Sequence, residues 1–204
     1  SSGDPRIEVQ NGVEKVYGSE RGTGRVAIDT NRYTIGASER TEIQRDVREM
    51  LAIYESQLGV RVSRDFEVEL EVLGDRRQFE KRLGSRRSFS GFYRHDTGEA
   101  VVSAEGDRAS TRATLIHEAS HAVLGDRAPS APVWLNEGLA EYFELLGRSG
   151  GRTYIPAQEA RRGGLGAQVR DGLVPRVASL LGAQRDTFYA VQDTALQRSY
   201  DQAW

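Results

Sequence analysis

The chain has 204 residues, of which 38% are hydrophobic, enough for one substantial core, built as a single domain or as two small lobes. It contains no cysteine, which excludes disulfides and thiolate metal ligands, and its formal net charge of −2 does not favour nucleic-acid binding. No run of eighteen apolar residues occurs, so the sequence predicts no membrane span.

The first half of the chain predicts a mixture of strands and helices. In chain order, the apolar spacing predicts short strands over 5–35, a helix over 41–58, a strand over 66–73, a short helix over 75–83, and two strands over 89–93 and 99–103. Gly59 is placed to end the long helix, and a turn at 96–98 joins the last two strands. These elements predict a sheet that is accompanied by helices.

Residues 117–121 read His-Glu-Ala-Ser-His, an H-E-x-x-H pattern inside an apolar segment with helical spacing. Two histidines four residues apart, His117 and His121, project from one face of a helix, with Cβ atoms roughly 5–6 Å apart, close enough to bind one zinc ion. Glu118 between them can accept a proton from a water bound to the metal. Gly125 is placed to end the helix. The alternative is a metal-free helix with two ordinary, partly buried histidines.

A second helix is predicted over 134–143, and it carries Glu137 and Glu141 four residues apart, so both carboxylates point the same way. A catalytic zinc site takes three protein ligands, and two histidines with one glutamate are an established set. We therefore assign Glu137 as the third ligand and Glu141 as the carboxylate that accepts the free N–H of a ligand histidine. The alternative is a pair of solvated glutamates on an amphipathic helix whose apolar side includes Leu135 and Leu139.

The two motifs together resemble the gluzincin zinc metallopeptidases, most closely the peptidase MA-like group. Residues 134–142 read Trp-Leu-Asn-Glu-Gly-Leu-Ala-Glu-Tyr, and Glu137 follows His121 after fifteen intervening residues, a few fewer than in thermolysin-like or aminopeptidase members. The resemblance implies that His117, His121 and Glu137 bind one zinc ion per chain and that Glu118 is the general base.

The order of the elements predicts an α+β fold, with one catalytic domain over residues 1–204. An α/β lobe is expected over about 1–105 and a zinc-binding helical lobe over about 106–204, with a flexible break at 147–151 before a helical C-terminal segment. The resemblance implies that the H-E-x-x-H helix lies at the floor of a cleft between the two lobes, beneath an edge strand.

Ala100, Val101 and Val102 are the residues expected at that edge. An extended peptide substrate could add to such a strand through backbone hydrogen bonds. A role in the core explains the two valines equally well.

Tyr200 opens a short segment, Tyr-Asp-Gln-Ala-Trp, that is similar to a pattern at the start of a late helix in aminopeptidase-type gluzincins. The resemblance implies that its hydroxyl donates to the oxyanion of the tetrahedral intermediate. The family helix continues beyond this point, so we expect a domain truncated at its C-terminus or a short last helix. A tyrosine packed at the start of a helix is the alternative.

These expectations favour a zinc-dependent peptidase that acts on a peptide or protein, with no nucleic-acid partner. A second hypothesis is a peptide-binding module that keeps zinc but has little or no turnover. A third is a metal-free structural domain in which the motif is fortuitous.

Overall fold

The computed structural model describes residues 6–10, 13–17, 25–29, 35–63, 65–84, 89–149 and 152–156, together with residues 167, 170, 171, 181, 182 and 188. The chain divides into two compact units, Ser1–Pro129 and Ser130–Trp204. In the described part, the first unit contains a six-stranded sheet and three helices, and the second contains a helix and a two-stranded sheet. This mixture of helices and strands is compatible with the predicted α+β class.

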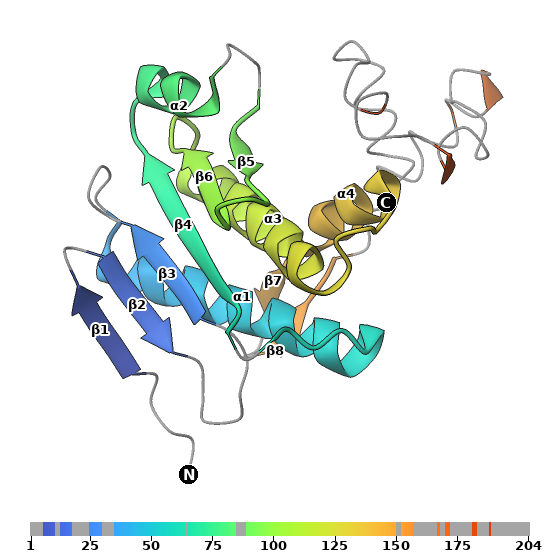
Figure 1. Ribbon diagram of the computed structural model, residues 1–204, viewed down its shortest axis with the longest axis horizontal. Coiled ribbons are helices and arrows are strands. Elements are labelled where there is room, and N and C mark those ends of the chain that lie inside the picture. The colour runs from blue at the N-terminus through green and yellow to red at the C-terminus, as the bar shows by residue number, and fades with distance from the viewer. Residues whose placement is uncertain are drawn as a thin grey trace. The chain divides into compact units, whose positions relative to one another are not determined.

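The large sheet consists of β1 (Arg6–Gln10), β2 (Val13–Tyr17), β3 (Arg25–Asp29), β4 (Glu67–Leu73), β5 (Gly91–Tyr93) and β6 (Glu99–Ser103). Its strand order is β1-β2-β3-β4-β6-β5 (Figure 1). The central strands β3, β4 and β6 are parallel, in a register that pairs Ile28 with Leu70 and Leu70 with Ala100. The outer strands β1, β2 and β5 pair in the antiparallel sense. The strands predicted over 66–73 and 99–103 are therefore confirmed.

Ala100, Val101 and Val102 do not form the edge of the sheet. They belong to β6, which lies between β4 and β5 and pairs with both strands. The prediction of an edge strand at these residues is wrong. The hairpin folds β5 back onto β6, so the backbone N–H and C=O groups of β6 on that side pair with β5. The edge is β5, and the three β6 side chains are buried, with none of their surface exposed.

Helices α1 (Ala37–Leu58), α2 (Arg76–Leu83) and α3 (Arg108–Arg127) pack on this sheet. Phe79 of α2 lies in a buried cluster with Val101, and the rings of Phe79 and Phe92 are 5.5 Å apart. Gly91, the residue before Phe92 in β5, instead faces Thr114 of α3. Because successive side chains of a strand point to opposite faces, α2 and α3 cover opposite faces of the sheet at β5.

Some helix ends follow local sequence signals, whereas one expected helix end is not found. Gly59 ends α1 with a left-handed φ of 67°, as predicted, and Asp107 caps α3 by accepting a hydrogen bond from the Ser110 N–H (2.7 Å). The prediction that Gly125 ends α3 is wrong, because the helix continues to Arg127. A Cβ atom at Gly125 would lie 3.0 Å from His95 Nδ1. Gly125 thus serves close packing rather than helix termination.

The second unit begins with α4 (Val133–Phe143), followed by the antiparallel pair β7 (Gly147–Ser149) and β8 (Arg152–Tyr154). A flexible break was expected over 147–151, but residues 147–149 form a strand, so that prediction is wrong there. The helical segment predicted beyond residue 156 lies outside the described residues, apart from isolated positions.

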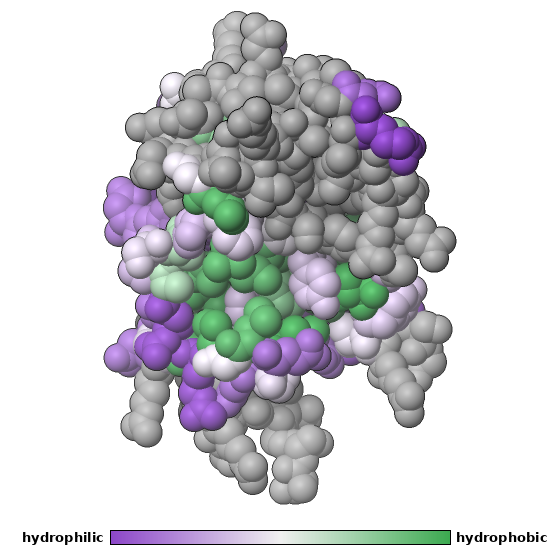
Figure 2. Space-filling model, turned by 90° about the vertical axis from the view of Figure 1, so that its right-hand side faces the viewer, coloured by the Kyte–Doolittle hydropathy of each residue, from purple (hydrophilic) through white to green (hydrophobic). Residues whose placement is uncertain are grey.

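Figure 2 shows apolar residues gathered in one area of one face, with hydrophilic residues along its border. The large hydrophobic side chains that are exposed in the described part are Leu58, Tyr154 and Leu181. No helix in the described ranges combines the length and the apolar character that crossing a bilayer requires.

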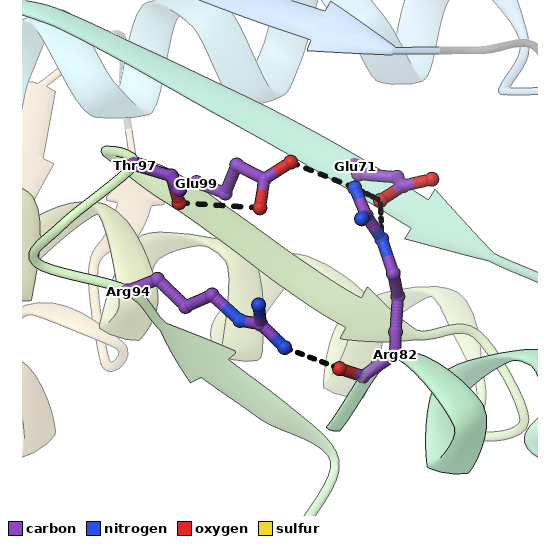
Figure 3. A network of polar contacts seen from close by, with 5 residues as sticks. All are labelled: Glu71, Arg82, Arg94, Thr97 and Glu99. Carbon is purple, nitrogen blue, oxygen red and sulfur yellow. Dashed lines mark hydrogen bonds and ion pairs between the residues drawn. The ribbon is translucent and has the colours of Figure 1, made fainter. Parts of the chain in front are cut away.

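A polar network fixes α2 to the sheet (Figure 3). Arg82 of α2 donates to Glu71 Oε2 from Nε and Nη2 (3.1 and 3.0 Å) and to Glu99 Oε1 from Nη2 (2.7 Å). Arg94 donates to the carbonyl oxygen of Arg82, and Thr97 donates to Glu99 (3.2 Å). Glu71 is buried, so the guanidinium provides the charge compensation that a buried carboxylate needs.

Helices α1 and α3 are joined by a buried hydrogen bond of 2.7 Å between the Tyr54 hydroxyl and Ser120 Oγ. Tyr54→Phe should lower the free energy of unfolding by about 1–3 kcal/mol, because the buried hydroxyl of Ser120 then has lost its hydrogen bond to Tyr54. Chemical denaturation measures the change. In Tyr54→Phe/Ser120→Ala both partners are absent, so we expect a smaller loss than the sum of the two single losses; strict additivity would contradict the coupling.

The same tyrosine makes the stability of the folded state depend on pH. Burial, opposed in part by the hydrogen bond to Ser120, raises the pKa of Tyr54 above its ordinary value of 10.0. The folded state therefore holds the proton where the unfolded state loses it, so this contribution to stability is present below pH 10 and is lost as the pH rises above it. We expect the parent to lose stability above about pH 10 more steeply than Tyr54→Phe does.

Candidate metal centre

Helix α3 places the two histidines of the motif on one face. The face that carries Ile116, Ala119, Ser120 and Val123 is buried, and this fixes the rotation of the helix about its axis. His117 is partly exposed and His121 is 8% exposed. Their ring centroids are 4.8 Å apart and the rings are nearly perpendicular, at 84°. Both rings can therefore approach one ion, as expected for residues four apart on a helix.

Glu118 is buried in the first unit and lies against strand β5. It is 5% exposed. A Cβ atom built on Gly91 would be only 2.7 Å from Glu118 Oε1, so the strand passes directly beside the carboxylate. Sequence reasoning identified Glu118 but not Gly91. A glycine inside a strand that is otherwise aromatic was the signal that could have identified it, because such glycines often mark a close approach.

Helix α4 buries polar as well as apolar residues. Asn136, Glu137 and Glu141 are 5%, 1% and 9% exposed, whereas Leu135 and Leu139 are only partly buried. The alternative of two solvated glutamates on an amphipathic helix is therefore wrong, and so is the expectation that these leucines form its buried side. Carboxylates buried to this extent need charge compensation, and a divalent cation is one source of it.

Two sets of three side chains in the described part of the chain offer atoms that could hold a metal ion. One set is His117, His121 and Glu137, and the other is His117, Glu141 and Glu144. Only the first combines both histidines of the motif with one carboxylate, which is the composition of a catalytic zinc site with a fourth position left for water. The donor types therefore fit zinc.

Tyr200, the predicted oxyanion donor, lies outside the described residues. The other predicted catalytic and metal-binding residues belong to two helices: His117, Glu118 and His121 to α3, and Glu137 and Glu141 to α4.

The comparisons with known proteins add no assignment: no family model matches the chain, and a search of curated proteins gives no match. The resemblance to gluzincins therefore stays a prediction, carried by residues 117–121 and 134–142. Function has to be inferred from the chemistry of these side chains.

Proposed function

We propose that this chain is a zinc-dependent peptidase of the gluzincin type. The observation that carries the proposal is the set of His117, His121 and Glu137, in which the glutamate is almost completely buried. Two imidazoles and one carboxylate suit zinc and match the ligands of established catalytic sites. Glutamates are almost never fully buried unless they are paired, and a bound cation is one such partner.

The roles of the residues follow from their chemistry. When bound, zinc would activate a water molecule and polarise the carbonyl group of the peptide. Glu118 would accept the proton of the attacking water and deliver it to the departing amine, because a carboxylate can act first as a base and then as an acid. His117, His121 and Glu137 would hold the ion.

Glu141 is proposed to support the ligands rather than to bind the ion. Glu141→Ala should weaken zinc affinity about 10- to 100-fold without abolishing binding, because the N–H of a ligand histidine loses its acceptor. Competition with a chromogenic chelator measures the affinity, with Glu137→Ala as the severe reference. If Glu141→Ala were the more damaging of the two, the second set, His117, Glu141 and Glu144, would be the better assignment.

Tyr200 is proposed to donate to the developing oxyanion. Tyr200→Phe should lower kcat, about 100- to 1,000-fold if the contact matches other oxyanion donors, because the contact strengthens mainly in the transition state. The apparent substrate affinity and the denaturant midpoint should change little, since the ring is kept. Steady-state kinetics of the parent and Tyr200→Phe measure kcat and KM. An unchanged kcat would show that Tyr200 is not the oxyanion donor, and the zinc assignment would be unaffected.

A peptide library provides the test of the function. The zinc-loaded protein is incubated with a diverse peptide mixture and the cleavage sites are identified by mass spectrometry, with Glu118→Gln as the matched control. Cleavage that depends on zinc and on Glu118 supports the peptidase. Retention of peptides without cleavage by the zinc-loaded protein would favour the peptide-binding module instead.

A further inference from the structure

Strand β5 approaches helix α3 more closely than a side chain at position 91 would allow. A Cβ atom on Gly91 would lie 2.6 Å from Thr114 Cγ2, 2.7 Å from Glu118 Oε1 and 3.0 Å from Glu118 Cγ. Non-bonded carbon atoms are in optimal contact at about 3.5–4.0 Å. Any residue other than glycine would therefore displace Thr114, Glu118 or the strand itself.

The backbone conformation does not explain this glycine. Positive φ angles occur among the described glycines at Gly59, Gly84 and Gly98, but not at Gly91. A glycine inside a strand weakens the strand and is common where another group approaches closely. The space taken by Thr114 and Glu118 is thus the reason for a glycine at position 91.

A second contact fixes β5 along the same face of α3. Tyr93 is two residues from Gly91, so both face the same side of the sheet. The ring of Tyr93 lies 3.3 Å from the place where a Cβ atom of Gly125 would be, and its hydroxyl 3.4 Å. Gly125 follows Glu118 by seven residues, or two helical turns, and therefore lies on nearly the same face of the helix. β5 therefore passes close to α3 at two points, at Gly91 and at Tyr93.

We propose that Gly91 is a positioning residue for the carboxylate of Glu118. Gly91 leaves the space that this side chain occupies, while the adjoining backbone of β5 limits its movement on that side. A misplacement of about 1 Å in a reacting group can cost about 100-fold in rate, so the absent side chain matters for the chemistry. The catalytic consequence rests on the proposed peptidase function, whereas the contact between the two residues does not.

The kinetic test is Gly91→Ala, with Gly36→Ala as the matched control. Gly36 has a φ of −63° and no atom within 4 Å of its Cβ position, so the same methyl group finds open space there. We expect Gly91→Ala to retain zinc and to lower kcat about 10- to 100-fold, with KM within about threefold of the parent, and Gly36→Ala to change neither. An unchanged kcat in folded, zinc-loaded Gly91→Ala would overturn the proposal.

Gly91→Ala/Thr114→Ala covers the case in which the single variant does not fold. The second substitution removes the nearest colliding atom, Thr114 Cγ2, and leaves the collision with Glu118. Stability should recover in the double variant while kcat stays low, with Thr114→Ala alone as its reference. Recovery of kcat to the level of Thr114→Ala would show that Glu118 is not displaced and would overturn the proposal.

A stability measurement tests the contact without any hydrolysis. The fall in the urea midpoint caused by Gly91→Ala is compared in the parent and in Glu118→Ala, both with excess zinc. The fall should be smaller in Glu118→Ala, because the shortened side chain leaves room for the new methyl group. Equal falls would overturn the contact. If the parent hydrolyses no peptide, the proposed function fails, and this comparison still decides whether Gly91 positions Glu118.

Discussion

Glu118→Gln is expected to fold and to bind zinc like the parent while losing nearly all hydrolysis. The amide has almost the same shape as the carboxylate, so the packing of Glu118 against Gly91 of β5 is kept. It cannot accept a proton from water, and general-base catalysis typically contributes about 100- to 10,000-fold in rate. We therefore expect kcat to fall by about that factor with zinc stoichiometry unchanged.

The measurement compares initial rates on one cleaved peptide for the parent, Glu118→Gln and Glu67→Gln. Glu67 is an exposed residue at the start of β4, so its change to an amide controls for the loss of one negative charge. Full activity in Glu67→Gln together with a large loss in Glu118→Gln fits the assignment. Undiminished hydrolysis by Glu118→Gln would show that another group accepts the proton.

Local signals in the sequence predicted most elements of the first unit well. The alternation in residues 66–73 corresponds to β4, and the glycine at position 59 adopts the left-handed conformation that its place after the apolar pattern suggested. The two histidines also face the same way, because their spacing alone determines this once a helix forms. Such features depend on residues that are close in the chain.

Features that depend on distant residues were predicted less well. Gly125 resembles a helix end in sequence, yet α3 continues past it, and the glycine instead makes room for His95. The leucines of α4 suggested an apolar buried side, but the buried side carries Glu137. An edge strand was expected at β6, whereas β5 covers it. In the first two cases the partner is remote in sequence or the buried group is polar, and hydrophobic periodicity reports neither. In the third case β5 is close to β6 in the chain, and the predicted turn between the two strands was the signal that β6 is covered.

The largest expected effect on metal binding is that of His121→Ala. His121 is 8% exposed and belongs to the set that it forms with His117 and Glu137. Removing a ligand should cost more than removing a supporting residue, so we expect a loss of zinc affinity above the roughly 10- to 100-fold typical of the latter. In the parent, zinc at a free concentration of 1,000 times its Kd should stabilise the folded state by about 4 kcal/mol. In His121→Ala this stabilisation by zinc should be lost.

Both consequences can be measured against His95→Ala, which removes the remaining histidine of the chain. His95 lies in the exposed turn between β5 and β6 and belongs to neither set of possible ligands. After dialysis against a mild chelator, elemental analysis should find about one zinc per chain in the parent and in His95→Ala, but little in His121→Ala. The increase in Tm on adding zinc should follow the same pattern. Full zinc occupancy in His121→Ala, or an equal loss in His95→Ala, would mean that the ion is bound elsewhere and that the proposed metal centre is wrong.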